Sequence, residues 1–249
     1  MKNILFIAPH PDDELVGATF IIKKILLKKN LIIFFPTNGV LSKEEMWFWD
    51  KKKYREKKQL RNDEMKKSLK VLGVKKFFNQ DIPTRKLKEN IETTFKKIKL
   101  LIKDNKIDTI FCPAYEGGHQ DHDVSNFICS RLQKTSKVYE YAEYNFSKGQ
   151  INCNEFVNPT KDEVTIKLSN KEKKEKIKLL EIYNSEKGNL DYLKLEKECY
   201  RKLYHYDYSK PPHLGKLFYR RFSFFSWHPR VDSDTPENVT NKIVNSEIF

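Results

Sequence analysis

One histidine and three acids stand close together near the start of the chain, in a pattern that could do chemistry. His10 is followed by Asp12, Asp13 and Glu14, directly after the apolar run of residues 4–8. Neighbouring carboxylates raise the cost of ionising one another, and a divalent cation would relieve that repulsion. Neutral imidazole nitrogens and carboxylate oxygens are common ligands of catalytic zinc. The stretch therefore predicts part of a metal site that needs a third ligand from elsewhere.

A second cluster of the same residue types occurs more than a hundred residues later. His119, Asp121 and His122 follow the apolar run of residues 109–114. The chain has six histidines, and three of them lie in the two clusters, so the histidines are not scattered at random. Binding sites of open α/β sheets form beyond the carboxyl ends of the strands. Two strand ends could therefore bring both clusters to one crevice.

The residue types suggest separate roles within such a site. We predict His10, Asp13 and His122 as metal ligands, with coordination positions left open for water and substrate. Asp12 is the predicted general base, because it adjoins a ligand and can accept a proton from metal-activated water. The competing interpretation is a hydrogen-bonded core histidine beside acids that favour helix N-termini. Two such clusters in one chain favour the metal.

The clusters resemble the signatures of the LmbE-like, or PIG-L, family of zinc-dependent deacetylases, which act on N-acetylglucosaminyl compounds. Residues 9–14 match the first signature, a strand followed by (A/P)-H-P-D-D-E, and residues 118–122 match the second, G-H-x-D-H. Residues 37–39 and residues 61–64 also fit the family pattern. The resemblance covers roughly the first 145 residues.

The resemblance implies roles for residues around the predicted ligands. His119 would face the substrate carbonyl rather than bind metal, and a protonated imidazole there would stabilise an oxyanion. Asp121 would orient His119 and hold it charged, while a fourth metal ligand remains the alternative for His119. Arg61 would bind substrate oxygens, against the alternative of a surface ion pair with Glu64 one helical turn away. Glu14 is expected to hold a ligand or the loop.

The implied reaction is metal-assisted hydrolysis of an N-acetyl group on an N-acetylglucosamine-type sugar conjugate, which releases acetate and a free amine. Zn2+ is the expected cofactor, although other divalent cations suit the same ligands. The expected partner is a small N-acetylated sugar conjugate and not nucleic acid, and a homo-oligomer is left open. Two alternatives remain: an amidase acting on another N-acyl small molecule, and a basic binding protein that has lost its chemistry.

Bulk composition sets broader limits. The net charge of +14 could serve an anionic partner, but the lysines are spread along most predicted helices, as solvated faces are. Four widely spaced cysteines form no C-x-x-C pair, which predicts free thiols in a reducing compartment. No apolar run approaches the roughly 20 residues of a membrane helix, and the first one is too short for a signal peptide. We therefore expect a soluble, cytoplasmic protein.

The hydrophobic pattern predicts an α/β fold, with a Rossmann-like, mostly parallel sheet, helices on both faces and a smaller C-terminal portion. We expect one domain over residues 1–249, in which residues 1–145 form the core that carries the metal site. Residues 146–249 would form a variable, substrate-facing portion. Predicted strands cover residues 4–8, 31–35, 76–78, 109–114, 138–145 and 164–168. Predicted helices cover residues 14–29, most of 42–73, 121–133 and 190–203, and two more begin near Asn90 and Asn170.

The start of the predicted helix over residues 42–73 is unusually aromatic. Trp47, Phe48, Trp49 and Tyr54 all lie within its first part. We expect these side chains to pack in the core, and an aromatic flap over a bound sugar is the alternative.

Overall fold

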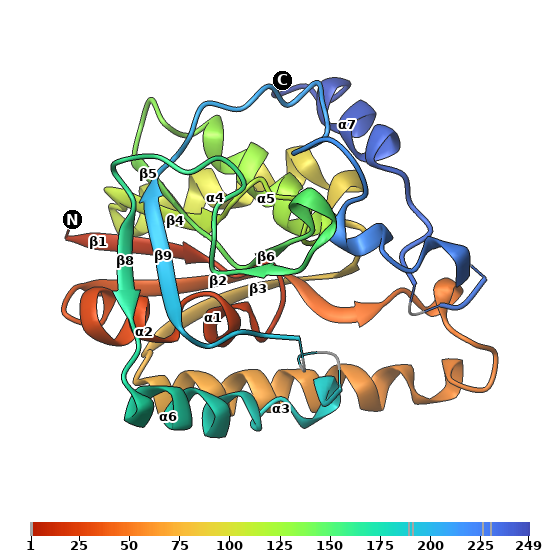
Figure 1. Cartoon of the computed structure of the whole chain (residues 1–249), viewed down its shortest axis with the longest axis horizontal. Helices are drawn as coiled ribbons and strands as arrows, with labels where there is room; N and C mark the ends of the chain where they lie inside the picture. Colours follow the sequence, from red (N-terminus) through yellow and green to blue (C-terminus); the bar gives the residue numbers. More distant parts are fainter. Residues whose placement is uncertain (1, 189, 191, 226, 230) are drawn as a thin grey trace.

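The computed structural model describes residues 2–188, 190, 192–225, 227–229 and 231–249. Within these residues, seven strands form one sheet (Figure 1). The strands are β1 (Asn3–Ile7), β2 (Asn30–Leu41), β3 (Lys76–Thr84), β4 (Thr109–Pro113), β5 (Lys137–Tyr141), β8 (Val164–Lys167) and β9 (Lys197–Lys202). Their order is β3-β2-β1-β4-β5-β9-β8, with the first five parallel and β9 antiparallel to both neighbours.

Helices cover both faces of the sheet, as the sequence predicts. Figure 1 shows one layer on each side. The first layer contains α1 (Asp13–Val16), α2 (Thr19–Ile21), α3 (Tyr54–Leu72) and α6 (Asn170–Leu180). The second contains α4 (Ile91–Asn105), α5 (Gln120–Ser130) and α7 (Pro236–Val244).

The unbroken apolar run of β1 follows from its place at the centre. Ile4 and Phe6 pack in the core cluster under α3, whereas Leu5 and Ile7 pack in the cluster under α4 and α5. Successive side chains of a strand point to opposite faces. A strand with helices on both sides therefore needs apolar residues at every position.

The order of the strands creates a crevice beside β1. β1 pairs in parallel with β2 on one side and with β4 on the other. The chain therefore moves outward from β1 to β3 and then returns to the opposite side of β1 as β4. Ligands of open α/β sheets bind beyond the carboxyl ends of the strands at such a reversal. Both clusters follow strands that end at this crevice.

The predicted helix over residues 190–203 is wrong, because residues 197–202 form β9. Four consecutive residues of this strand are buried, and two of them are the charged Glu198 and Arg201. Each has a buried partner of opposite charge, Lys176 and Glu140 respectively. Buried charges within a strand hide the hydrophobic pattern by which a strand is recognised.

Other element boundaries also differ from the predictions. The predicted helix over residues 14–29 is broken at Gly17 and Ala18, and continues as α2 and a π-helical turn (Ile22–Leu26). A Cβ at Gly17 would lie 2.5 Å from Cγ of Glu143, so a glycine lets the break pack closely. The helix expected over residues 42–73 becomes α-helical only at Tyr54, after two 3-10 turns.

Two strands are longer than predicted, and one is interrupted. β2 continues to Leu41, beyond the predicted end at residue 35, and β3 continues to Thr84, beyond the predicted end at residue 78. The strand expected over residues 138–145 stops at Tyr141 and resumes as β6 (Tyr144–Asn145). β6 pairs with β7 (Asn152–Cys153) in a separate two-stranded sheet, so the chain turns away from the main sheet there.

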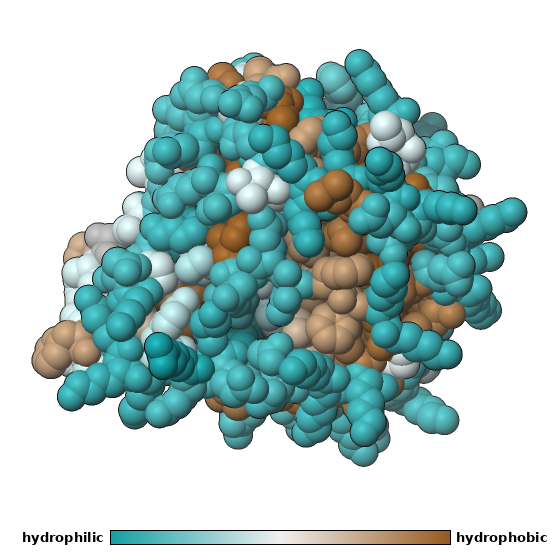
Figure 2. All heavy atoms as spheres, turned by 180° about the vertical axis from the view of Figure 1, so that it is seen from behind, coloured by the Kyte–Doolittle hydropathy of each residue, from teal (hydrophilic) through white to brown (hydrophobic). Residues whose placement is uncertain are grey.

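The surface agrees with the interpretation that the lysine side chains are solvated. Figure 2 shows the face behind that of Figure 1, where hydrophilic residues cover most of the surface and surround a hydrophobic band near the centre. The four cysteines are buried and unpaired, as the sequence predicts. Among the described residues, no helix combines the length and the apolar character needed to cross a membrane.

A buried ion pair joins β9 to the helices beneath it. Lys176 and Glu198 are fully buried, and Nζ of the lysine lies 2.6 Å from Oε1 of the glutamate. Glu198 also accepts the backbone N–H groups of Phe20 and Ile21, at 2.8 and 2.9 Å. These donors lie in the first turn of α2, where a helix has no partners of its own for them. Glu198 therefore stabilises the broken helix as well as the sheet edge.

Glu198→Gln is expected to lower the free energy of unfolding by about 3–5 kcal/mol, because it leaves the Lys176 ammonium buried without a counter-charge. Lys173→Gln is the matched control, since Lys173 lies on the same helix as Lys176 and its ion pair with Glu196 is at the surface. That variant should lose less than about 1 kcal/mol. Urea denaturation followed by circular dichroism measures both, and equal losses would contradict the role given to the buried pair.

Candidate metal centre

Three ligand atoms from the two clusters meet at the crevice. Nδ1 of His10, Oδ2 of Asp13 and Nε2 of His122 lie 3.3 Å apart in all three pairs. Ligands held about 2.0–2.1 Å from a tetrahedral zinc ion lie about 3.3 Å from one another. All three residues are buried. The spacing therefore fits one face of a tetrahedral site and leaves a fourth position for water or substrate.

A hydrogen bond to its second ring nitrogen decides which nitrogen His10 offers to the site. Nε2 of His10 lies 2.9 Å from Oδ2 of Asp121, and an ionised carboxylate can only accept. Neutral His10 therefore carries its proton on Nε2 and directs the Nδ1 lone pair at the other ligand atoms. Nδ1 of His122 has no hydrogen-bond partner in the described part of the chain, and Oε2 of Glu143 lies 3.9 Å away. Neutral His10 thus directs an unprotonated Nδ1 at the point toward which Nε2 of His122 is also directed.

The electrostatics of this group reflect the close pairing of its ionisable side chains. Burial favours the neutral form of His10, but the carboxylates of Asp13 and Asp121 outweigh it and raise the pKa of His10 to about 10. For Asp13, burial is opposed by His122 and His10, which together hold the pKa of the carboxyl well below its usual value. A cation bound by His10, Asp13 and His122 would take the place of the protons that balance the carboxylate charge.

Glu14 holds the loop that carries the first cluster. Its carboxylate accepts the N–H of Asp12 at 3.0 Å, the hydroxyl of Tyr183 at 2.6 Å and the hydroxyl of Ser68. Asp12 has a φ of 132°, a region that costs a residue other than glycine about 1–3 kcal/mol. The fully buried Glu14 thus ties this strained backbone to α3 and to the C-terminal portion.

Asp12 lines the cavity beside the ligand atoms, and its carboxylate faces Arg61. Oδ2 of Asp12 lies 3.2 Å from Nη2 of Arg61, which donates to the carbonyl of Pro11, and Nη1 of the same guanidinium lies 3.2 Å from Oε1 of Glu186. Burial raises the pKa of Asp12 well above its usual value, although the guanidinium opposes the shift. Arg61 is 4% exposed, so its observed contacts position Asp12. That Arg61 binds substrate oxygens stays a prediction.

His119 is the N-cap of α5, and its ring accepts a hydrogen bond from the following turn. Nδ1 of His119 accepts the backbone N–H of Asp121 at 3.0 Å, so neutral His119 carries its proton on Nε2. The carboxylate of Asp121 lies 3.7 Å from this ring but 2.9 Å from His10. It therefore orients His10, whereas we expected it to orient His119. Burial, followed by repulsion from His10, lowers the pKa of His119 well below its usual value.

Asp121 also fixes the chain that follows β3. Oδ2 accepts the N–H of Arg85 at 2.7 Å and the hydroxyl of Thr84 at 3.2 Å, and Oδ1 accepts the N–H of Leu87 at 3.3 Å. One carboxylate thus links the end of β3 to His10. This role has no signal in the sequence, because the donors are backbone groups of a distant segment.

Two buried acids near the site were not predicted. Asp123 accepts the N–H groups of Glu116 and Gly117 and shapes the loop before His119, and burial raises its pKa to about 8. Glu143 is fully buried beside His122, and neither of its carboxylate oxygens is hydrogen-bonded to any described residue. Asp123 could have been found from its place in the second cluster. Glu143 lies in a predicted strand, where nothing marked it.

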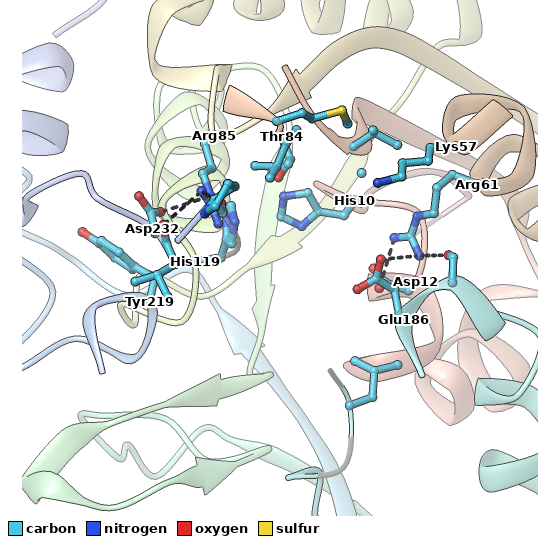
Figure 3. Close-up of a pocket in the computed structure, with 18 of the residues that line it drawn as sticks. His10, Asp12, Lys57, Arg61, Thr84, Arg85, His119, Glu186, Tyr219 and Asp232 are labelled. Carbon is cyan, nitrogen blue, oxygen red and sulfur yellow. Dashed lines mark hydrogen bonds and ion pairs between the residues drawn. The ribbon is translucent and has the colours of Figure 1, made fainter. Parts of the chain in front are cut away.

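Five of the predicted site residues border a cavity of about 770 Å³, a size that suits a small molecule: His10, Asp12, Asp13, Arg61 and His119. In Figure 3, His10 lies between two groups of charged residues. Arg61 contacts two acids on one side, and Arg85 lies near Asp232 on the other. Residues between 185 and 232 supply much of the wall, so the C-terminal portion takes part in the cavity.

Two of the aromatic residues near position 47, Trp47 and Trp49, lie at this cavity, and Phe48 between them is exposed. Phe48 and Trp49 are 75% and 53% exposed, so the expectation of core packing is wrong for them. Trp47 and Trp49 stack at 4.8 Å and line the cavity, and Trp47 lies 6.4 Å from Trp227. A loop of 3-10 turns holds these rings away from the sheet, where helical periodicity could not anticipate them.

A family model described as PIG-L, GlcNAc-PI de-N-acetylase, matches residues 5–132, which are just over half of the 249 residues. The chain belongs to this family. The matched region contains both clusters and every predicted site residue, and it confirms the resemblance drawn from the two signatures. No curated protein matches the sequence.

Solved structures similar to this PIG-L family chain span most of it at low identity. A deacetylase of the teicoplanin biosynthesis pathway has a TM-score of 0.63 at 13% identity, covering 83% of this chain and 99% of its own. The N,N'-diacetylchitobiose deacetylase of Pyrococcus horikoshii has a TM-score of 0.54 at 18% identity, covering 86% of each chain. The 4-carboxy-2-hydroxymuconate hydratase of Pseudomonas putida has a TM-score of 0.52 at 13% identity, covering 83% and 98%. These likenesses show the fold, and the hydratase shows that the fold is not tied to one reaction.

Asp13→Ala is expected to weaken zinc binding at least about 100-fold, because it removes one of three ligands and leaves two imidazoles. Asp63→Ala is the control, since it removes an exposed carboxylate of α3 within the same family pattern. Zinc titration against a chelator of known affinity measures both variants. Unchanged affinity in Asp13→Ala would remove this carboxylate from the ligand set.

Asp121→Asn should weaken zinc binding by about 10–100-fold without removing a ligand, because it alters the hydrogen bond that fixes the tautomer of His10. The same chelator titration applies. A variant that binds zinc as tightly as the wild-type protein would show that the orientation of His10 does not depend on this carboxylate.

Proposed function

We propose that the protein is a metal-dependent hydrolase that removes the N-acetyl group of an N-acetylglucosamine-type sugar conjugate, releasing acetate and a free amine. The observation that carries the proposal is the set of three ligand atoms 3.3 Å apart, beside the cavity-lining carboxylate of Asp12. Membership of the PIG-L family supports a deacetylase of sugar-type substrates. The cavity volume is in keeping with a conjugate of this size.

His10, Asp13 and His122 would hold the cation, and their two imidazoles and one carboxylate suit Zn2+. When bound, such a cation lowers the pKa of a water ligand and polarises the acyl carbonyl. Asp12 accepts the proton of the attacking water, and its raised pKa brings it closer to the range of an effective base at neutral pH. Arg61 holds the carboxylate of Asp12 at the cavity wall.

His119 acts on the carbonyl oxygen. Its Nδ1 is occupied by the backbone N–H of Asp121, so Nε2–H is the group available to donate. A donor fixed before the reaction stabilises negative charge on the oxygen as it develops. The neutral ring serves as this donor, so the protonated form inferred from the sequence is not needed. The proton taken up by Asp12 then passes to the departing nitrogen, and the products are acetate and the amine.

An amidase acting on another N-acyl small molecule would use the same residues, and only the cavity walls would differ. Trp47 and Trp49 favour the sugar, because their apolar faces suit the C–H groups of a pyranose ring. A panel of N-acyl compounds with and without a sugar separates the two functions.

Asp12→Asn is expected to lower the rate of acetate release by about 10²–10⁴-fold, because the amide cannot accept the proton of water. Zinc content should stay at the wild-type level, since Asp12 is not among the three ligands. The measurement is acetate release from N-acetylglucosaminyl conjugates by zinc-loaded protein, with zinc determined in the same samples. Full activity in the variant would exclude Asp12 as the base, and no release from any conjugate by wild-type protein would overturn the proposed function.

A further inference from the structure

The wall formed by the C-terminal portion carries an arginine that the proposed reaction does not use. Arg221 lines the cavity directly after the 3-10 turn Phe218–Arg220. Its Cζ lies 3.6 Å from the ring centroid of Phe218 and 4.7 Å from that of Phe222, and Nη1 donates to the Phe218 carbonyl at 3.0 Å. Stacking on aromatic faces restricts a guanidinium without using its remaining N–H donors. These contacts therefore hold the Arg221 guanidinium at the cavity wall.

Within the described part of the chain, Arg221 differs from the other cationic side chains at the cavity in lacking an acidic partner. Three cations there form ion pairs: Lys57 with Asp50, Arg61 with Asp12, and Arg85 with Asp232. Among the residues that the structure places, no carboxylate lies within ion-pair distance of Arg221. Burial lowers the pKa of Arg221 from its usual value, the direction expected when no carboxylate compensates for lost water. A charge that is partly removed from water gains most from an anion that arrives with the ligand.

An aromatic wall connects Arg221 to the candidate metal ligands. The ring of Tyr144 lies 5.7 Å from that of His122 and 4.6 Å from that of Phe218, on which Arg221 stacks. Two rings therefore separate the guanidinium from a ligand imidazole. A substrate whose acyl group is at the ligand atoms could place another part against Arg221.

We propose that Arg221 binds an anionic group, a carboxylate or a phosphate, on the part of the substrate that lies away from the scissile N-acyl group. This inference rests on the proposed function and narrows it to N-acyl amino sugars whose aglycone is negatively charged. A planar guanidinium binds both anions through paired hydrogen bonds. The net charge of +14 would also concentrate such substrates near the protein.

The test compares three substrates of zinc-loaded protein: N-acetylglucosamine 1-phosphate, a carboxymethyl N-acetylglucosaminide, and the neutral methyl N-acetylglucosaminide. R221Q should lower kcat/KM about 10–100-fold for at least one anionic substrate, mainly through KM, and change the neutral substrate less than about 3-fold. R221K keeps the charge but not the paired geometry, and should recover part of the loss. A loss confined to the phosphate or to the carboxylate identifies which anion the site takes.

R131Q is the matched control, because Arg131 also stacks on an aromatic ring, 4.8 Å from the centroid of Phe127, but does not line the cavity. It should leave all three substrates unchanged. Circular dichroism shows whether each variant is folded. If R221Q is not folded, R221K is used instead, and it should lose kcat/KM for an anionic substrate but not for the neutral one. Equal effects of R221Q on charged and neutral substrates, or no effect on any, would overturn the proposal.

The failure of the proposed function would give a different result. In that case wild-type protein would release acetate from none of the three compounds. Calorimetric binding of the same compounds then tests Arg221 directly. R221Q should weaken binding of an anionic compound at least 10-fold relative to the methyl glycoside, and unchanged binding would overturn the inference.

Discussion

The parallel pairing of β1 with β4 is the constraint on which the site depends. Their register places Phe6 beside Phe111, so the segments that follow both strands emerge at the same edge of the sheet. His10 and Asp13 follow one strand and His122 follows the other. Three atoms 3.3 Å apart can come from segments so distant in sequence only because the core fixes both strands between two helical layers. Packing of the core therefore determines the geometry of the ligand set.

Buried carboxylates have different structural roles around this crevice. Glu14 and Asp123 accept backbone N–H groups and shape the two loops, while Asp121 joins β3 to His10. Such groups are costly to bury unless hydrogen bonds satisfy them. Asp12 and Asp13 are left to face the cavity. The acid-rich composition of the two clusters thus reflects architecture as much as chemistry.

The features that could be predicted from the sequence are those encoded by short stretches of neighbouring residues. Apolar runs placed the central strands, and the two clusters placed the candidate ligands at their ends, because these patterns need no knowledge of distant contacts. β9 was missed because Glu198 and Arg201 are buried only with partners from other elements. The partner of the Asp121 carboxylate was missed for the same reason, whereas the C-terminal portion was expected to face the substrate without its wall residues being identified. Phe48 and Trp49 were expected in the core because the hydrophobicity of an aromatic side chain does not show whether it is buried, exposed or at a cavity.

The hydrogen bond from Tyr183 to Glu14 has a consequence for the order of events during biosynthesis. All three candidate ligands are translated within the first 122 residues, yet the strained backbone at Asp12 is supported by a hydroxyl from a segment synthesised much later. A nascent chain that has reached only its first half therefore has the donor atoms without the complete scaffold that fixes them. The loop that carries the first two candidate ligands therefore gains its full support only once residue 183 has been made, and a chain truncated before that point lacks it.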